Sequence, residues 1–426
     1  MRILIVGGGG REHALCWALQ RENPDAELHC APGNPGTAAL VRNVPIPADD
    51  IDRLADCADM LGIDLTVVGP EVPLARGLAD RLRAEGRAVL GPSAAAAQIE
   101  ASKAFAKDVM AAAGVPTAAS RTFTDLAQAL AWVDRHPEPL VVKASGLAAG
   151  KGAVVCPTRA EARQVVQAML GAGAFGEAGR TVVIEAFLEG EEVSLFGLTD
   201  GTDVEFLPAA QDHKRLLDGD LGPNTGGMGA YSPVAIATPA LFDRARREVY
   251  LTVLEELRRR GMPFSGVLYA GLMVDPAGTP WVVEFNCRLG DPEAQVVLPR
   301  VGGGLTDAFW RVARGERPTP IRARSVAAVT TVLAAQGYPD RPQGGAAVTI
   351  PQDLAAGVTV FHAGTTLDDA GMLRVAGGRV LNVTGTAPTF AEAQRLSREA
   401  AERITFAGKV FRRDIGWREA GRLAPV

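Results

Sequence analysis

Short apolar runs that stop at a glycine are the feature of this sequence that most restricts its fold. Residues 2–6, 65–68 and 88–90 form such runs, and a similar run at 27–30 stops at an Ala-Pro-Gly turn. Runs of this kind are typical of strands buried on both faces of a parallel sheet. Because stretches with helical spacing separate them, the pattern predicts a doubly wound α/β domain over residues 1–100.

The pattern changes along the rest of the chain. Thr238 and Pro239 are a favoured start for a helix, which Gly261 is placed to end. Strand-like segments dominate the last hundred residues, at 327–333, 347–350, 358–361 and 380–384. The fold class is therefore α/β and α+β, in several domains. The predicted domains are an N-terminal α/β substrate domain (1–100), a central domain (101–120 and 190–325), a mobile α+β lid (121–189) and a C-terminal β-rich domain (326–426).

Charge, cysteine content and hydropathy exclude several classes of protein. The net charge of the 426-residue chain is only −5, and no basic stretch is long enough to predict nucleic-acid binding. Five scattered cysteines without a CxxC pair favour a reduced, cytoplasmic protein without structural zinc. No apolar run reaches the length of a membrane span, so no membrane association is expected.

The glycine cluster at residues 7–10 suggests a dinucleotide site but fits its pattern poorly. Glu12 or His13 falls where the third glycine of GxGxxG should stand, and the second strand does not end in an acid. A nicotinamide or flavin site is therefore disfavoured. Glycines before a helix still offer free N–H groups to an anion. Gly9 and Gly10 are therefore predicted to bind a phosphate group of a substrate that is not a dinucleotide. A tight structural turn is the alternative.

A second glycine-rich loop follows the strand that ends at Lys143. It contains Lys151, but Gly152 replaces the Ser or Thr of a Walker loop. Two lysines around a glycine loop predict a lid that covers triphosphate oxygens. A flexible hairpin with solvated lysines is the alternative. Further on, the main chain of the turn at residues 185–192 can form hydrogen bonds with an adenine, and its carboxylates can accept hydrogen bonds from a ribose. A charged hairpin turn without a ligand is the alternative.

Residues 211–229 form the most unusual segment of the chain. Acids, bases and glycines are packed together there with almost no core-forming residues. Long loops inside compact proteins tend to be functional or disordered. Disorder is disfavoured because the segment leads into Ala-Tyr-Ser-Pro at 230–233. The segment is therefore predicted to be a long loop that binds a substrate or nucleotide.

Glu284 and Asn286 are the candidate metal ligands. Strand alternation places both side chains on one face, and hard oxygen ligands two residues apart suit a magnesium ion. Arg288 continues the same parity and can meet a carboxylate or phosphate with two hydrogen bonds. A simple turn feature is the alternative for the carboxylate.

Together these segments resemble the phosphoribosylamine–glycine ligase family of the ATP-grasp superfamily. The resemblance covers essentially the whole chain. The motifs that carry it are residues 9–14, 33–36, 143–152, 211–233 and 286–293. It implies an ATP-grasp architecture for the central domain and lid, with ATP between them.

The resemblance also implies a role for each matching residue. The implied ATP-binding residues are Lys103, Lys143 and Lys151 at the phosphates, Glu185, Phe187 and Leu188 around the adenine, Glu192 at the ribose, and Arg215 and Asn224 nearby. The implied substrate-binding residues are Gly9, Gly10, Asn34, Gly36, Asp212, Lys214 and Arg288. The implied catalytic residues are Lys143, Asp212, Arg215 and Arg288. Glu284 and Asn286 would bind Mg²⁺ or Mn²⁺.

This sequence departs from the family pattern at two places. Ser145 stands where the lid loop commonly has an acid, which removes a carboxylate near ATP. Residues 269–273 contain no carboxylate, whereas many ATP-grasp enzymes supply a metal ligand from that strand. Whether one ion or two bind is therefore left open.

The implied activity is the ATP-dependent joining of glycine to 5-phosphoribosylamine through glycyl phosphate, in purine biosynthesis. Transient contacts with neighbouring purine-pathway enzymes are a further expectation. Three alternatives are an ATP-grasp purine enzyme that uses bicarbonate, a nicotinamide-dependent oxidoreductase, and a nucleotide sensor without catalysis.

Overall fold

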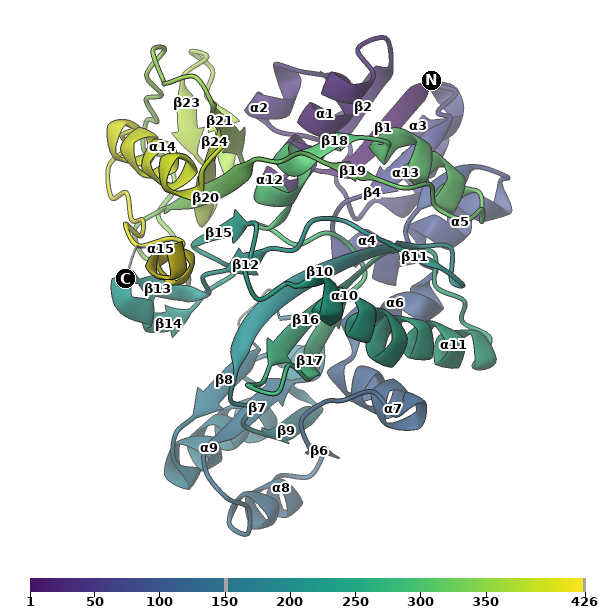
Figure 1. Ribbon diagram of the computed structural model, residues 1–426, viewed down its shortest axis with the longest axis vertical. Coiled ribbons are helices and arrows are strands. Elements are labelled where there is room, and N and C mark those ends of the chain that lie inside the picture. Colours follow the sequence, from purple (N-terminus) through teal and green to yellow (C-terminus); the bar gives the residue numbers. More distant parts are fainter. Residues whose placement is uncertain (149–151, 424–426) are drawn as a thin grey trace.

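The computed structural model describes residues 1–148 and 152–423. Figure 1 shows the N-terminal and C-terminal sheets beside each other at the top, with the lid at the bottom and a central sheet between. His362 N donates to His13 Nδ1 at 2.8 Å and joins the two upper parts directly. Among the described residues, no helix has the length and apolar character needed to span a bilayer.

The N-terminal domain is a five-stranded parallel sheet in the order β3-β2-β1-β4-β5. Its strands are β1 (Arg2–Gly7), β2 (Glu27–Pro32), β3 (Arg42–Asn43), β4 (Leu65–Val68) and β5 (Ala88–Leu90). Its helices are α1 (Gly10–Glu22), α2 (Pro35–Ala38), α3 (Ile51–Met60), α4 (Glu71–Ala75) and α5 (Leu78–Ala84). The four strands expected from the apolar runs are confirmed, and the β1 residues Ile3 to Val6 are fully buried.

The central domain has a four-stranded antiparallel sheet in the order β11-β10-β16-β17. Its strands are β10 (Glu191–Thr199), β11 (Val204–Phe206), β16 (Gly266–Val274) and β17 (Pro280–Asn286). Helix α6 (Ala94–Ala101) leads into it from the N-terminal domain. Its own helices include α7 (Lys103–Ala113), α10 (Pro239–Ala245), α11 (Leu251–Arg259), α12 (Ala294–Val297) and α13 (Leu305–Ala313). The expected helix start is confirmed, because Thr238 Oγ1 accepts a hydrogen bond from Leu241 N at 3.2 Å. A π-helical turn (Arg246–Tyr250) joins α10 to α11.

The lid is a small antiparallel sheet in the order β6-β9-β7-β8, packed with two helices. Its strands are β6 (Ser120–Phe123), β7 (Leu140–Ala144), β8 (Ala153–Cys156) and β9 (Val182–Ala186), and its helices are α8 (Leu126–Val133) and α9 (Arg159–Val166). A separate apolar core forms between sheet and helices. The lid can therefore hold its shape without help from the central domain.

The C-terminal sheet has the order β12-β15-β20-β24-β21. Its strands are β12 (Gln211–Asp212), β15 (Gly229–Ser232), β20 (Ala327–Ala334), β21 (Val358–His362) and β24 (Arg379–Ala387). The small hairpin of β22 (Thr365–Leu367) and β23 (Leu373–Val375) and the helices α14 (Phe390–Arg403) and α15 (Trp417–Leu423) complete this part. The strand expected at residues 347–350 is wrong, because that segment makes only single bridges, at Ala347 and Thr349.

The prediction of a long loop at residues 211–229 is also wrong. The segment contains β12, a hairpin of β13 (Arg215–Leu217) and β14 (Leu221–Asn224), and the start of β15. Met228 and Tyr231 are fully buried. The segment is ordered although it has few apolar side chains, because the backbone N–H and C=O groups of β15 form hydrogen bonds with β20. Strand β20 lies about a hundred residues later in the chain. Sheet pairing thus links the predicted central and C-terminal domains, whose limits stay predictions.

Candidate active site

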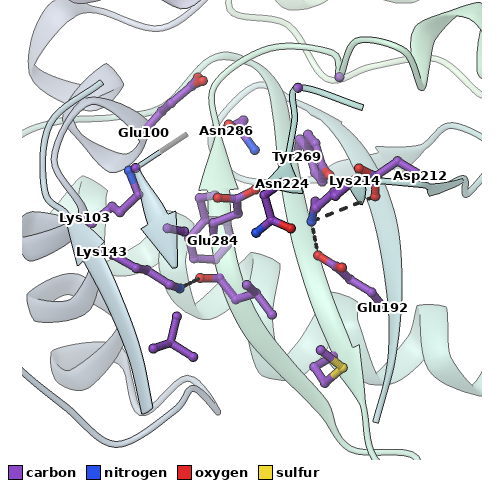
Figure 2. A pocket seen from close by; sticks show the side chains of 18 of the residues that line it. Glu100, Lys103, Lys143, Glu192, Asp212, Lys214, Asn224, Tyr269, Glu284 and Asn286 are labelled. Carbon is purple, nitrogen blue, oxygen red and sulfur yellow. Dashed lines mark hydrogen bonds and ion pairs between the residues drawn. The ribbon is translucent and has the colours of Figure 1, made fainter. Parts of the chain in front are cut away.

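A cavity of about 790 Å³ lies where the lid, the central sheet and the segment 211–226 meet. Residues from the N-terminal and C-terminal domains, including Arg11 and Arg379, also line it. Figure 2 shows Lys103 and Lys143 on one side, Lys214 with Asp212 and Glu192 on the other, and Glu284 between them. Charged side chains from five segments of the chain therefore face one space.

The lid side of the cavity holds what we call the lid lysine cluster, made of Lys107, Lys143 and Glu185. The Glu185 carboxylate lies 3.2 Å from Lys107 Nζ and 3.0 Å from Lys143 Nζ, and all three side chains are buried. Burial lowers the pKa of Lys107 to about 8, against the opposing effect of Glu185. Two ammonium groups thus share one carboxylate beside the cavity.

Lys103 stands at the start of α7, where Ser145 fixes the backbone. Lys103 N donates to Ser145 O at 2.8 Å, and Ala104 N donates to Ser145 Oγ at 3.1 Å. Burial lowers the pKa of Lys103, partly offset by Glu284. The serine found in place of the usual acid is therefore a structural link between lid and central domain.

The opposite side holds what we call the inner acid cluster, made of Glu192, Asp212, Lys214 and Glu293. Lys214 Nζ bonds directly to Glu192 and lies 3.9 Å from Asp212 Oδ1. Burial raises the pKa of Asp212 to about 8, although Lys214 opposes this effect. Here carboxylates outnumber ammonium groups.

Glu284 and Asn286 lie between the two clusters near the end of β17. Both are partly exposed and line the cavity, whereas Phe285 between them is buried. Neither side chain makes a hydrogen bond or ion pair with another described residue. Burial alone would raise the pKa of Glu284, but Lys214, Lys143 and Lys103 outweigh it and hold the pKa low. An ionised carboxylate and an amide oxygen, both free, fit a hard divalent cation.

Arg288 already has two carboxylate partners. Its guanidinium lies 2.7 Å from Glu100 Oε1 and 3.3 Å from Glu71 Oε2, and these acids raise its pKa despite burial. Cys287 N also donates to Glu100 Oε2 at 2.8 Å. The arginine is thus oriented at the cavity wall, as its strand parity predicted.

The predicted nucleotide-binding residues among the described part of the chain line the cavity. Phe187, Leu188 and Glu192 line it, as do Arg215 and Asn224 on the facing strands β13 and β14. The Glu185 carboxylate holds the two lysines of the lid lysine cluster. The place of Glu185 beside the adenine stays a prediction. Lys151 lies outside the described residues.

The four N-terminal residues predicted to contact the phosphoribosyl group do not line this cavity. They make packing contacts within the N-terminal domain and with the C-terminal part. A Cβ at Gly10 would lie 2.3 Å from Asn382 Nδ2, and one at Gly36 would lie 2.3 Å from His13. Asn34 caps α2 and donates to Gly8 O and His362 O. Gly9 N donates to Glu12 Oε2 at 2.7 Å. Their substrate role stays a prediction.

Several residues that sequence reasoning did not assign also line the cavity. Those that matter most are Lys107, Tyr269, Glu293, Arg379 and Arg418. Glu293 belongs to a motif that was recognised, and Lys107 lies one helical turn after Lys103, which is the signal that could have found it. Arg379 and Arg418 come from the C-terminal part, and no local pattern marks them.

Comparison with known proteins identifies the family. Family models described as the N, ATP-grasp (A) and C domains of phosphoribosylglycinamide synthetase match residues 1–100, 101–294 and 328–418. A phosphoribosylamine–glycine ligase of Ralstonia nicotianae is 48% identical over 99% of this chain and 100% of its own length. One from Nostoc is 47% identical over 98% of this chain and 99% of its own length.

Solved structures agree. A phosphoribosylamine–glycine ligase from Thermotoga maritima is 34% identical, with a TM-score of 0.84 over 97% of this chain and 100% of that one. A biotin carboxylase from Campylobacter jejuni, at 15% identity and a TM-score of 0.72 over 96% and 92%, shares the fold alone. The chain belongs to the phosphoribosylglycinamide synthetase family.

Proposed function

We propose that this chain joins glycine to 5-phosphoribosylamine with the energy of ATP, giving glycinamide ribonucleotide, ADP and phosphate. Membership of the family makes it an ATP-dependent ligase that uses a divalent metal. The observation that supports the specific reaction is the cavity itself. It combines buried lysines from α7 and from the lid strand β7, free Glu284 and Asn286, and an acid-rich opposite side. The metal we propose is Mg²⁺, with Mn²⁺ as a substitute.

The chemistry needs no side-chain nucleophile. A glycine carboxylate oxygen attacks the γ-phosphorus of ATP, and the bond to the β-bridging oxygen breaks to release ADP. The ribosylamine nitrogen then attacks the carbonyl carbon of glycyl phosphate, loses a proton and expels phosphate. Catalysis is therefore positioning and charge neutralisation.

The side chains of the cavity divide this task. Lys103 and Lys143 line the cavity and would neutralise phosphate oxygens. Arg288, which Glu71 and Glu100 hold in place, would bind the transferred group. A divalent cation bound by Glu284 and Asn286 would supply further positive charge. Closure of the lid over the cavity would exclude water, which otherwise hydrolyses an acyl phosphate.

The decisive experiment measures ADP release with ATP, magnesium, glycine and freshly prepared 5-phosphoribosylamine. We expect turnover that needs both substrates, and a ribonucleotide product that carries the glycyl group. Replacing glycine with bicarbonate tests the carboxylating alternative, and NAD(P)H fluorescence tests the oxidoreductase. ATP binding without ADP release under all conditions would contradict the proposal and favour a nucleotide sensor.

The glycyl-phosphate intermediate needs its own test. With ATP and glycine but no ribosylamine, added hydroxylamine should convert an acyl phosphate to glycine hydroxamate, with one ADP per hydroxamate. ADP without hydroxamate, in the presence of active enzyme, would contradict that intermediate. All five cysteines are buried and free, which fits a reducing compartment, and the cytoplasmic location and contacts with neighbouring enzymes stay predictions.

A further inference from the structure

We propose that Arg412 is a positioning residue that holds Arg215 in place beside the nucleotide. Arg412 does not line the cavity, and it belongs to the C-terminal segment that joins α14 to α15. Arg215 lies on β13 and lines the cavity. The proposal rests on the function proposed above, because it needs ATP beside Arg215. It goes beyond that function by giving the C-terminal segment a part in the reaction.

The hairpin of β13 and β14 has little apolar core to hold it. Leu217 is 47% exposed and Leu221 is 63% exposed, although the two residues pair across the hairpin. An isolated two-stranded hairpin is marginally stable in water. Figure 1 shows this hairpin beside α15, near the C-terminus. Its position therefore depends on polar contacts with neighbouring segments.

The C-terminal segment supplies polar contacts to the tip of the hairpin. Arg413 N donates to Asp218 Oδ1 at 2.7 Å. Gly219 N donates to Asp414 Oδ2 at 2.8 Å. Two consecutive residues of the tip are therefore tied to two consecutive residues of the C-terminal segment.

Asp220, the next residue of the tip, has a backbone conformation that its neighbours must hold. Its φ is 55°, in the left-handed region that residues other than glycine seldom adopt. Its Oδ1 accepts a hydrogen bond from Arg412 Nη1 at 2.9 Å, and its Oδ2 accepts one from Arg418 Nη2. Backbone conformations of this kind persist where the surroundings fix them. The two arginines therefore fix the turn.

The Arg412 guanidinium links this turn to the first strand of the hairpin. The side chain is fully buried, and its Nε and Nη2 donate to the two carboxylate oxygens of Asp414 at 2.7 and 2.8 Å. Its Nη1 donates to Arg215 O at 3.1 Å as well as to Asp220. A lysine cannot make this set of contacts, because its ammonium group has a single nitrogen instead of a planar fork.

Arg215 is held at two points through Arg412. Its carbonyl oxygen accepts a hydrogen bond from Arg412 directly. Its Nε donates to the carbonyl oxygen of Asp220 at 3.4 Å, and Arg412 binds the carboxylate of the same residue. Among the described residues, no carboxylate forms an ion pair with Arg215. Its guanidinium therefore keeps a positive charge in the cavity wall, where the phosphate oxygens of ATP would bind it.

The experiment measures the Kd of ATP with magnesium for Arg412→Lys, by titration calorimetry of the full chain. The ammonium group keeps the charge but loses the fork, so Arg215 is held less firmly and the Kd should rise about tenfold. Arg403→Lys is the matched control, because Arg403 pairs with Asp353 on the exposed surface of α14 and makes no contact with the hairpin. It should bind ATP as wild type does. An unchanged Kd in Arg412→Lys would overturn the proposal.

A double-mutant cycle tests whether Arg412 acts through Arg215. Arg215→Gln should raise the Kd of ATP about tenfold, because the phosphates lose a cation. In that background Arg412→Lys should raise the Kd by less than about twofold, since the residue through which it acts is already gone. Fully additive effects would mean that Arg412 supports only the fold, and would overturn the proposal.

Asp414→Asn keeps the proposal testable if Arg412→Lys folds poorly. The Asp414 side chain is 23% exposed, and the change removes one acceptor of the fork. The Kd of ATP should rise about threefold and the glycine KM should stay within about twofold. Equal increases for both substrates, or an unchanged Kd in folded protein, would contradict the positioning role. Wild type that binds ATP but does not join glycine to the ribosylamine would instead contradict the proposed function.

Discussion

The lid lysine cluster and the inner acid cluster are built from the same residue types in opposite ratios. In the first, Lys107 and Lys143 share the single carboxylate of Glu185. In the second, Glu192, Asp212 and Glu293 surround the single ammonium group of Lys214. Each end thus carries an excess charge that its own residues do not balance. We infer from this excess that phosphate oxygens would bind at the lid side and a cation at the far side.

The two clusters also differ in how many hydrogen bonds their charged groups make with the rest of the protein. Lys107 Nζ donates to Thr117 Oγ1 at 2.7 Å and Ala118 O at 3.2 Å, and Lys143 Nζ donates to Val283 O at 3.0 Å. The Asp212 carboxylate accepts no hydrogen bond from a described residue. The lid cluster is therefore satisfied in the empty protein, whereas burial raises the pKa of Asp212 to about 8, so the acid cluster keeps a proton on this carboxyl at neutral pH until a ligand arrives.

Removing the carboxylate between the two clusters should have the largest effect. We expect Glu284→Ala to lower magnesium-dependent turnover by about a thousandfold, because the cation loses its only charged protein ligand of the pair. Stability should change little, since the Glu284 side chain has no hydrogen bond to lose. Turnover against magnesium concentration, with thermal unfolding alongside, measures both.

The matched control for this prediction is Glu255→Ala on the exposed face of α11. It should behave as wild type in both measurements. Near-normal turnover of Glu284→Ala at limiting magnesium would show that the metal is bound elsewhere.

Breaking the lid lysine cluster should have a smaller effect. In Lys107→Met, Glu185 keeps Lys143 as its only partner, so Lys143 is less free to turn to a phosphate. We expect the KM of ATP to rise about tenfold, or about 1.4 kcal/mol, with the KM of glycine unchanged. Lys107→Arg keeps the charge and should recover part of the loss. Equal increases for both substrates would mean that Lys107 only supports the fold.

The sequence was a good guide where a site depends on neighbours in the chain. That Glu284 and Asn286 both face the cavity could be predicted, because two residues that alternate along one strand share a face whatever the strand packs against. Their role as metal ligands stays a prediction. The role of Glu185 could not, because its partner Lys107 lies on a helix 78 residues earlier. The strand β15 was missed for a similar reason, since its pairing partner β20 comes about a hundred residues later. Long-range pairing leaves no mark in local spacing.

The N-terminal glycine turns also depend on distant parts of the chain. They contain Gly9, Gly10, Asn34 and Gly36. Glycines before a helix suggest an anion site, but a close approach between domains needs glycine just as much. Gly10 lies against Asn382 and Gln295, and Gly36 against His13 and His362. Only the position of the C-terminal sheet shows this packing, and that position is set by contacts more than three hundred residues apart.

The smallest expected effect is on the stability of the metal-free protein, and it tests the proton that the inner acid cluster keeps. Asp212 faces Lys214, Glu293, Glu192 and Glu284, and burial raises its pKa to about 8. In the unfolded chain its pKa is near the ordinary value of about 3.9. Between these values the folded protein keeps a proton that the unfolded chain has lost. Wild-type stability therefore falls as pH rises through this window, by up to about 1.4 kcal/mol per pH unit from this group.

Asp212→Asn cannot lose that proton, so its stability relative to wild type should increase steadily from about pH 4 to about pH 8 and then level off. Urea unfolding in the presence of a chelator, at several pH values, measures the difference, with Asp243→Asn on the exposed face of α10 as the control. A difference that does not change with pH would mean that Asp212 is ionised throughout. The acid cluster would then be balanced by the protein itself, and its contrast with the lid lysine cluster would no longer point to a cationic ligand.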